Sequence, residues 1–249
     1  SHYLGTNFAK AYDVRFLNRQ GERELAYATS WGLSTRAVGA VLMTHGDDKG
    51  LRLPPAVAPV QVAVVPIYRS DEQRSGVLEA CSRLSAELEG LRVHVDDRDD
   101  VRPGFKFNEW ELRGVPVRVE LGPRDIEANQ VTLAPRLTGE KETVPLPKVA
   151  DAVRDALDAS QRGLLDQARE FRDAHTFRPK DMAEMRSLLE DPGGFMVTGW
   201  CGSEECEAKV KAETKATLRF LPIEPSAPDA PCIVCGRPAV DEAAWAQAY

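Results

Sequence analysis

The sequence has no long hydrophobic run. None of its apolar stretches approaches the roughly 18 residues that a membrane-spanning helix needs, so we expect no transmembrane segment and no membrane partner. The chain starts at Ser1 and shows no basic region followed by an apolar one, the pattern of a secretory leader. We therefore expect no signal peptide, and we expect the chain to begin inside a domain.

An excess of positive charge is absent as well. The 32 Lys and Arg residues face 39 Asp and Glu residues, which gives a formal net charge of −7. Binding nucleic acid through bulk electrostatics needs clustered cations, so any contact with RNA must be local. Internal repeats and low-complexity tracts are also missing. The 249 residues are enough for two or three domains with real cores.

Cysteines are few, and four of the five lie near the C-terminal end. Cys201 and Cys206 are separated by four residues, and Cys232 and Cys235 by two. Two such pairs, each in a hairpin-like knuckle, can converge on one tetrahedral ion, and four thiolates leave no open position. The pattern therefore predicts a structural Zn²⁺ site in a reducing compartment, the cytoplasm; buried free thiols or disulfides are the alternative. Cys81 stands alone and is expected to be a small buried hydrophobe.

Proline-rich connectors divide the chain into three parts. Residues 1–58 mix short strands with one helix, and residues 59–147 alternate strands with helices, as in a small α/β sheet domain. Residues 148–249 begin with a long amphipathic helix and contain the cysteine pairs. The apolar spacing predicts strands at 11–17, 24–29, 60–67, 91–95, 117–121, 195–200 and 217–223, and helices at 34–43, 71–89, 107–114, 149–174 and 180–190.

One stretch carries a resemblance to a known family. Residues 29–36 read TSWGLSTR, and residues 45–48 read HGDD before a proline-rich segment. This stretch resembles motif 3 of class II aminoacyl-tRNA synthetases in its prolyl form. Residues 1–10, SHYLGTNFAK, resemble the segment after motif 2 in the same enzymes. The resemblance runs to the C-terminal end and includes the cysteine spacing, which marks the archaeal and eukaryotic-like subgroup of prolyl-tRNA synthetases.

The fold that this resemblance implies is multidomain, α/β and α+β. Residues 1–58 would be the remnant of a class II antiparallel-sheet catalytic domain, and residues 59–147 an α/β anticodon-binding domain with a mixed sheet. Residues 148–249 would be an α/β zinc-binding C-terminal domain. Motifs 1 and 2 are not in the sequence, so we do not expect this chain to catalyse alone.

The resemblance also implies a reaction. Prolyl-tRNA synthetases activate L-proline with ATP and Mg²⁺ to prolyl-adenylate and transfer the prolyl group to tRNA(Pro), and class II enzymes are usually homodimers. The catalytic motif 3 arginine that holds ATP would be Arg36, whose planar guanidinium can bind two phosphate oxygens at once. Ser34 would contact the adenylate, and His2, Trp31 and Gly32 would belong to the proline pocket. The HGDD loop is expected to be a structural turn.

Five polar residues are implied at the anticodon: Glu111, Arg118, Arg124, Asp125 and Lys141. Arginines and carboxylates together suit the edges of guanine, and every proline anticodon carries GG at its second and third positions. The alternative for each residue is a solvated or internally paired charge. Three nearby aromatic residues are expected to pack in the core rather than stack on bases, namely Phe105, Phe107 and Trp110.

The C-terminal segment 241–249 is expected to be an anchored helix or strand, and the resemblance implies that the carboxylate of Tyr249 inserts near the active site. The alternative is a surface tail. Two other functions compete with the main reading. One is a non-catalytic RNA-binding protein derived from a synthetase, and the other is a threonyl, histidyl or glycyl enzyme of the same class.

Overall fold

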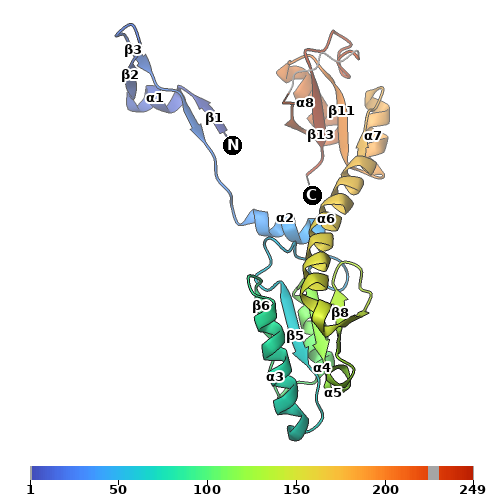
Figure 1. The fold of residues 1–249 in the computed structure, drawn as a ribbon. Helices are drawn as coiled ribbons and strands as arrows, with labels where there is room; N and C mark the ends of the chain where they lie inside the picture. Colours follow the sequence, from blue (N-terminus) through green and yellow to red (C-terminus); the bar gives the residue numbers. More distant parts are fainter. Residues whose placement is uncertain (1, 224–229, 249) are drawn as a thin grey trace. The chain divides into compact units, whose positions relative to one another are not determined.

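The computed structural model describes residues 2–223 and 230–248. Two compact units divide after Asp158, and Figure 1 labels their elements. The helices are α1 (Asn7–Tyr12), α2 (Arg36–His45), α3 (Asp71–Glu87), α4 (Pro103–Leu112), α5 (Pro123–Glu127), α6 (Val149–Ala174), α7 (Met182–Glu190) and α8 (Glu204–Thr214), with a 3-10 turn η1 (Leu146–Lys148). The strands are β1 (His2–Gly5), β2 (Arg15–Leu17), β3 (Arg23–Leu25), β4 (Ala28–Ser30), β5 (Val62–Pro66), β6 (Val93–Val95), β7 (Val117–Leu121), β8 (Gln130–Pro135), β9 (Glu142–Pro145), β10 (Thr176–Phe177), β11 (Phe195–Trp200), β12 (Thr217–Phe220) and β13 (Asp241–Ala246). Within the described ranges, every helix is too short or too polar to cross a bilayer.

A five-stranded sheet forms the centre of the first unit, in the order β6-β5-β7-β8-β9. β6, β5 and β7 are parallel, whereas β8 and β9 run antiparallel to their neighbours, so the predicted mixed sheet is confirmed. Successive residues of a strand face opposite sides, and on β5 Val62 and Val64 enter one core while Ala63 and Val65 enter the other. A strand buried on both faces reads as a continuous apolar run, which is why the sequence revealed it.

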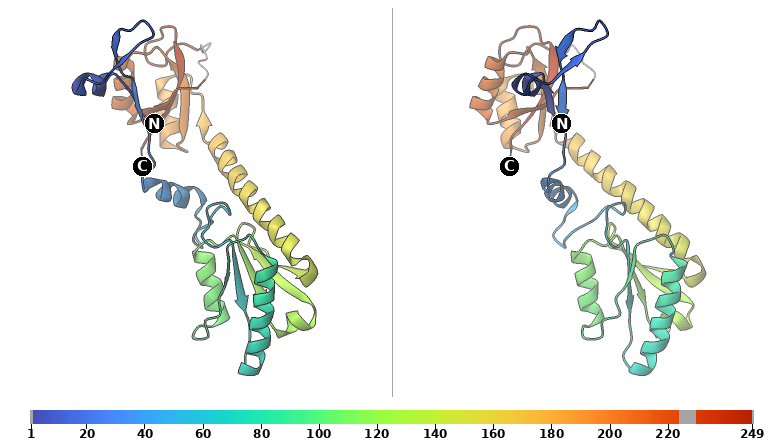
Figure 2. Two further views of the ribbon diagram at one scale, coloured as in Figure 1. Left: turned by 60° about the vertical axis from the view of Figure 1, so that its left-hand side comes forward. Right: turned by 90° about the vertical axis from the view of Figure 1, so that its left-hand side faces the viewer.

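Helices cover both faces of this sheet. The side chains of Val77 and Leu84 on α3 and of Val153 on α6 pack into the larger core, together with the fully buried Cys81. Burial raises the pKa of the Cys81 thiol to about 12, as expected of a small buried hydrophobe. On the other face, α4 packs Trp110 against β5. Figure 2 shows α3 and α4 on opposite sides of the strands.

A buried polar cluster joins α4 to the sheet. Asp96 follows β6, is fully buried, and accepts hydrogen bonds from Nε and Nη2 of Arg98, both 2.8 Å, and from Nε1 of Trp110, 2.9 Å. Lys106, 2% exposed, places its Nζ 3.7 Å from this carboxylate and donates to the Asp96 carbonyl at 2.8 Å. Burial raises the pKa of Asp96, but these hydrogen bonds and the Lys106 charge outweigh it, so the pKa lies well below its ordinary value.

Residues 2–45 form two small antiparallel pairs, β1-β4 and β2-β3, with α1 and α2. The helix predicted at 34–43 is confirmed as α2. The strand predicted at 11–17 is wrong in its first half, because Ala11 and Tyr12 end α1 and the chain turns at Asp13, which has a left-handed φ of 53°. Within this range, which is described throughout, Ala9 alone is buried.

The second unit contains a four-stranded sheet, in the order β10-β11-β13-β12. β10 and β11 are parallel, and β13 runs antiparallel between β11 and β12. Its core joins Met185 of α7 and Val210 of α8 to Met196 and Trp245 of the sheet. The Trp245 indole donates to the Thr198 hydroxyl at 2.9 Å. The predicted anchored segment at 241–249 is confirmed as strand β13 over its first six residues.

The elements that the apolar pattern did not predict include α5, β8, β9 and α8. β9 carries one buried residue, Val144, which is too few for an alternation to be visible. The buried side of α8 consists of Cys206, Val210 and Thr214, so its apolar stripe is weak. The expectation that Cys206 lies in a hairpin-like knuckle is wrong, because it lies in the first turn of this helix.

We predict that Asp96→Ala lowers the free energy of unfolding by about 3–5 kcal/mol, because removing one member of a buried charge pair leaves the other uncompensated. Urea unfolding measures the change. Asp97→Ala is the matched control, since Asp97 is exposed and its loss should stay within about 0.5 kcal/mol. Equal unfolding midpoints for the two variants would show that Asp96 does not hold α4.

Candidate nucleic-acid interface and metal centre

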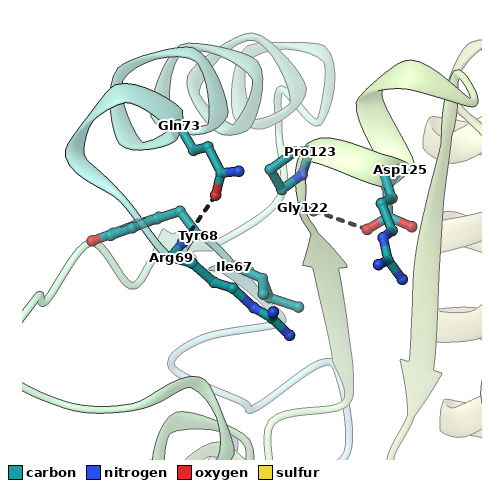
Figure 3. A pocket seen from close by; sticks show the side chains of 8 residues that line it. Ile67, Tyr68, Arg69, Gln73, Gly122, Pro123 and Asp125 are labelled. Atoms are coloured by element: carbon teal, nitrogen blue, oxygen red, sulfur yellow. Dashed lines mark hydrogen bonds between the residues drawn. The ribbon is translucent and has the colours of Figure 1, made fainter.

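A first hollow lies where two parallel strands end. Because β5 and β7 are parallel, their carboxyl ends meet at one edge of the sheet, the usual ligand-binding edge of open α/β sheets. We call this the β5–β7 hollow; it has a volume of about 310 Å³ (Figure 3). It is lined by Ile67, Tyr68, Arg69, Gln73, Gly122, Pro123, Arg124 and Asp125.

Two of the predicted anticodon residues line the β5–β7 hollow. Arg124 is exposed, whereas Asp125 accepts a hydrogen bond at 2.9 Å from the N–H of Gly122 and so fixes the start of α5. On the opposite side of the hollow, Gln73 accepts from the N–H of Arg69 at 3.1 Å. Arg69 and Gln73 were not predicted as site residues. Arg69 lies between β5 and α3, and Gln73 lies in the first turn of α3, where polar residues are common and carry no distinctive pattern.

A second hollow lies between α4 and the β8 end of the sheet. We call it the α4–β8 hollow; it has a volume of about 180 Å³. It is lined by Lys49, Trp110, Glu111, Val115, Arg118, Ala134, Pro135, Arg136, Gly139 and Lys141. The other three predicted anticodon residues, Glu111, Arg118 and Lys141, are therefore brought together here, while Arg124 and Asp125 lie in the first hollow.

Two cations of the α4–β8 hollow lie over one aromatic ring. The Arg118 guanidinium carbon lies 4.7 Å from the centre of the Phe107 ring, and the Lys141 Nζ lies 5.0 Å from it. Both cations also contact Glu120, a buried residue of β7 that was not predicted as part of the site. A cation in such a position is attracted to the face of the aromatic ring.

The aromatic residues near this hollow differ in burial. Trp110 is buried and Phe107 packs against the same small core, as predicted. Phe105 is 56% exposed, so the expectation of core packing is wrong for it. The reason is the phase of α4, whose buried residues are Lys106 and Trp110; Phe105 precedes Lys106 and faces solvent.

Arg136 connects this hollow to the end of α2. Its Nη1 donates to the Asp47 carboxylate at 2.9 Å, and its Nε donates to the Glu111 carbonyl at 3.2 Å. The hydrogen bond from Arg136 lowers the pKa of Asp47 to about 2, against a smaller opposing effect of burial. Asp47 of the HGDD loop thus has a structural role, as expected. Neither Arg136 nor Lys49, which lies 3.7 Å from Glu111, was predicted from the sequence.

Backbone pairing strengthens that connection. The N–H of Leu51 donates to the Leu112 carbonyl at 3.0 Å, and the N–H of Leu53 donates to the Gly114 carbonyl at 3.1 Å. Gly114 has a left-handed φ of 72°, and a Cβ there would lie 2.5 Å from Leu51. Only glycine suits this position, since it combines a positive φ with close backbone approach.

The residues implied at the ATP and proline sites lie in the open segment 2–45. β1 pairs with β4, which sets His2 opposite Ser30, the residue that precedes Trp31 in the chain. Arg36 is the first residue of α2. All five of these residues are exposed: His2, Trp31, Gly32, Ser34 and Arg36. Tyr249 lies outside the described residues.

The four clustered cysteines converge. Their sulfur atoms all lie within 4.8 Å of one another; the Cys201 sulfur is 3.6 Å from that of Cys206 and 3.7 Å from that of Cys235. Tetrahedral Zn–S bonds of about 2.3 Å place sulfurs about 3.8 Å apart, whereas a disulfide needs about 2.05 Å. The donor set and spacing therefore fit one metal ion and not disulfides, and Cys232 completes the set.

The surroundings of the sulfurs are asymmetric. The Arg237 Nε donates to the Cys235 sulfur at 3.3 Å, and this hydrogen bond lowers the pKa of the Cys235 thiol. Burial raises the pKa of Cys206. Tight turns follow Cys201 and Cys235, since Gly202 and Gly236 have left-handed φ values of 77° and 69°.

Comparison with known proteins agrees with this architecture. Residues 61–156 match the family described as "Anticodon binding domain", and residues 182–249 match "Prolyl-tRNA synthetase, C-terminal". The first match contains all residues that line the two hollows except Lys49, and the second contains the four cysteines.

Curated relatives extend the similarity to the whole chain. It is 46% identical over 251 aligned residues to "Proline--tRNA ligase 2" of Clostridioides difficile, 47% to "Proline--tRNA ligase" of Rubrobacter xylanophilus and 44% to that of Flavobacterium johnsoniae. Each alignment covers 100% of this chain and 51–52% of the relative, so the chain spans about half the length of these relatives. The two domain matches and this similarity along the whole chain confirm the resemblance to prolyl-tRNA synthetases: the chain contains an anticodon-binding domain and a prolyl-tRNA synthetase C-terminal domain.

Proposed function

We propose that this chain is the anticodon-reading and zinc-binding part of a proline–tRNA ligase, which activates L-proline with ATP and transfers it to tRNA(Pro). The observation that carries the proposal is the distribution of the polar residues over two hollows of one domain. Each hollow combines an arginine with a carboxylate: Arg124 with Asp125 in one, Arg118 with Glu111 in the other. Two such sites suit the two adjacent guanines of a proline anticodon.

The chemistry of guanine supports this assignment. Its O6 and N7 accept hydrogen bonds, which arginine can donate as a pair, and its ring N–H and amino groups donate to a carboxylate. Single-stranded loops are recognised through such base edges and through aromatic neighbours rather than through bulk charge. A chain with a formal net charge of −7 can therefore bind an anticodon loop through local contacts with the base edges.

The catalytic assignment rests on residues 2–45. The matched relatives are about twice as long as the chain, and residues 2–45 expose large apolar side chains such as Trp31 (81%) and Leu33 (89%), which a larger catalytic domain would cover. Within that domain, Arg36 would bind the phosphates of ATP, with Mg²⁺ offsetting their charge. Ser34 would contact the adenylate, His2, Trp31 and Gly32 would bind proline, and the Tyr249 carboxylate would approach the same site.

The metal assignment is Zn²⁺ in a structural role. Four thiolates at tetrahedral spacing leave no open coordination position, so the ion would supply cross-linking and no catalytic chemistry. It would join the end of β11, through Cys201, to the first turn of α8, through Cys206, and to the turn that carries Cys232 and Cys235. A reducing cytoplasm, which keeps these thiols free, and a homodimeric assembly complete the proposal.

We predict that variants of the full-length enzyme separate anticodon recognition from ATP binding. Arg118→Ala and Glu111→Ala should reduce charging of tRNA(Pro) by about tenfold or more, the loss expected for one bidentate base contact, and leave proline-dependent ATP–pyrophosphate exchange unchanged. Arg36→Ala should reduce exchange on the order of 100-fold and leave tRNA binding intact. Steady-state charging and exchange assays measure both effects.

Arg83→Ala is the matched control, because Arg83 is an exposed arginine of α3 paired with Glu79. It should leave both assays unchanged. Normal charging by both anticodon-site variants would remove the α4–β8 hollow from RNA recognition, and normal exchange by Arg36→Ala would remove Arg36 from the ATP site. Absence of exchange in the unaltered full-length protein would favour the non-catalytic RNA-binding alternative.

We also predict about one zinc ion per chain, released by the double change of Cys232 and Cys235 to Ser. Metal analysis by mass spectrometry measures the content, and hydrogen exchange should show loosened protection of α8. Cys81→Ser is the control, because Cys81 is buried in the other unit and its loss should not change the zinc content. A metal-free native chain would contradict the assignment.

A further inference from the structure

Glu120 is a buried carboxylate on a central strand. It is 6% exposed and lies on β7 two residues after Arg118, so both side chains are on the same face of the sheet. That face is the one covered by α4. Charged side chains are almost never buried unless they are paired, and the pairing of Glu120 is therefore informative.

Both partners of Glu120 are cations of the α4–β8 hollow. Its Oε1 accepts from Nε and Nη2 of Arg118, at 3.1 and 3.0 Å. The Lys141 Nζ lies 2.7 Å from Oε1 and 2.8 Å from Oε2. One carboxylate thus holds two cations, Arg118 on β7 and Lys141 in the segment directly before β9. Both cations lie over the Phe107 ring.

The pairing leaves Arg118 with a defined set of free donors. A guanidinium has five N–H groups; two are directed at Glu120, and Nη1 donates a third to the Phe107 carbonyl at 3.3 Å. Two N–H groups remain, the number that pairs with O6 and N7 of guanine. The orientation of these two groups depends on Glu120, because the guanidinium is planar and rigid.

We propose that Glu120 is a positioning residue for the recognition of one guanine of the anticodon, acting through Arg118 and Lys141 without touching the base. This inference rests on the proposed function. Glu120 also offsets one of the two positive charges that it pairs with, Arg118 and Lys141, so the site gains selectivity for a base edge and loses attraction to phosphate. Its loss should therefore lower discrimination while leaving binding to non-cognate RNA unchanged or stronger.

The test is the binding of this chain to short RNA stem-loops, followed by fluorescence anisotropy. One stem-loop carries the proline anticodon, and two others carry A in place of one G each. Arg118→Ala first identifies the position that the α4–β8 hollow reads. Glu120→Gln should then lower discrimination by about tenfold at that position only, with equal or tighter binding of the substituted loop. Glu120→Asp, which keeps the charge, should restore part of the discrimination.

Glu142→Gln is the matched control, an exposed glutamate of β9 in the same sheet, and should change nothing. Unaltered discrimination by Glu120→Gln, or an equal loss of affinity for all three RNAs, would overturn the positioning role, the second result indicating a structural role alone. If Arg118→Ala also discriminates normally, the failure lies in the proposed base reading by this hollow, and both assignments fall together.

Discussion

The carboxylate of Asp96, fully buried beneath α4, is the contact on which the side of the first unit proposed to face RNA depends. The apolar side of α4 is small, since Trp110 and the aliphatic part of Lys106 are its buried members. Hydrogen bonds to Asp96 from Trp110 and the charge of Lys106 replace the missing apolar contacts. Satisfied buried polar networks of this kind fix a unique packing more strictly than apolar contacts do.

The position of α4 in turn sets the α4–β8 hollow. The helix supplies Glu111 and the Phe107 ring, and the sheet beneath supplies Arg118 and Glu120. At its C-terminal end, α4 pairs with the segment that follows α2, and Arg136 joins the Glu111 carbonyl to Asp47. The segment that follows α2 and the helix that carries Glu111 are therefore linked by short, directional contacts within one unit.

How much of this could be predicted from the sequence depends on the kind of signal. β5 was predicted because a strand buried on both faces is continuously apolar, and β7 because Val117, Val119 and Leu121 alternate with polar residues. α6 was predicted with its observed bounds because its stripe is long and regular. The cysteine spacing predicted the convergence of four sulfurs. The polar partners were not predictable: Glu120, Arg136 and Arg69 look like ordinary surface charges in the sequence, and only the pairing of strands and the packing of α4 bring them to the hollows.

The division of the anticodon residues was also beyond the sequence. Glu111, Arg118, Arg124 and Asp125 lie within fifteen consecutive positions, which suggested one surface. β7 separates them. Arg118 lies on the face of β7 that α4 covers, whereas Arg124 follows the carboxyl end of β7 at Leu121 and lines the β5–β7 hollow. The account of function therefore depends on two sites, each for one base.

The most direct measurement is the charging of tRNA(Pro) transcripts with A at the second or the third anticodon position by full-length Arg118→Ala and Arg124→Ala enzymes. The account predicts that each variant loses discrimination at one position and keeps it at the other, and that the two positions differ. Loss at the same position in both variants, or full discrimination in both, would contradict the assignment of one guanine to each hollow.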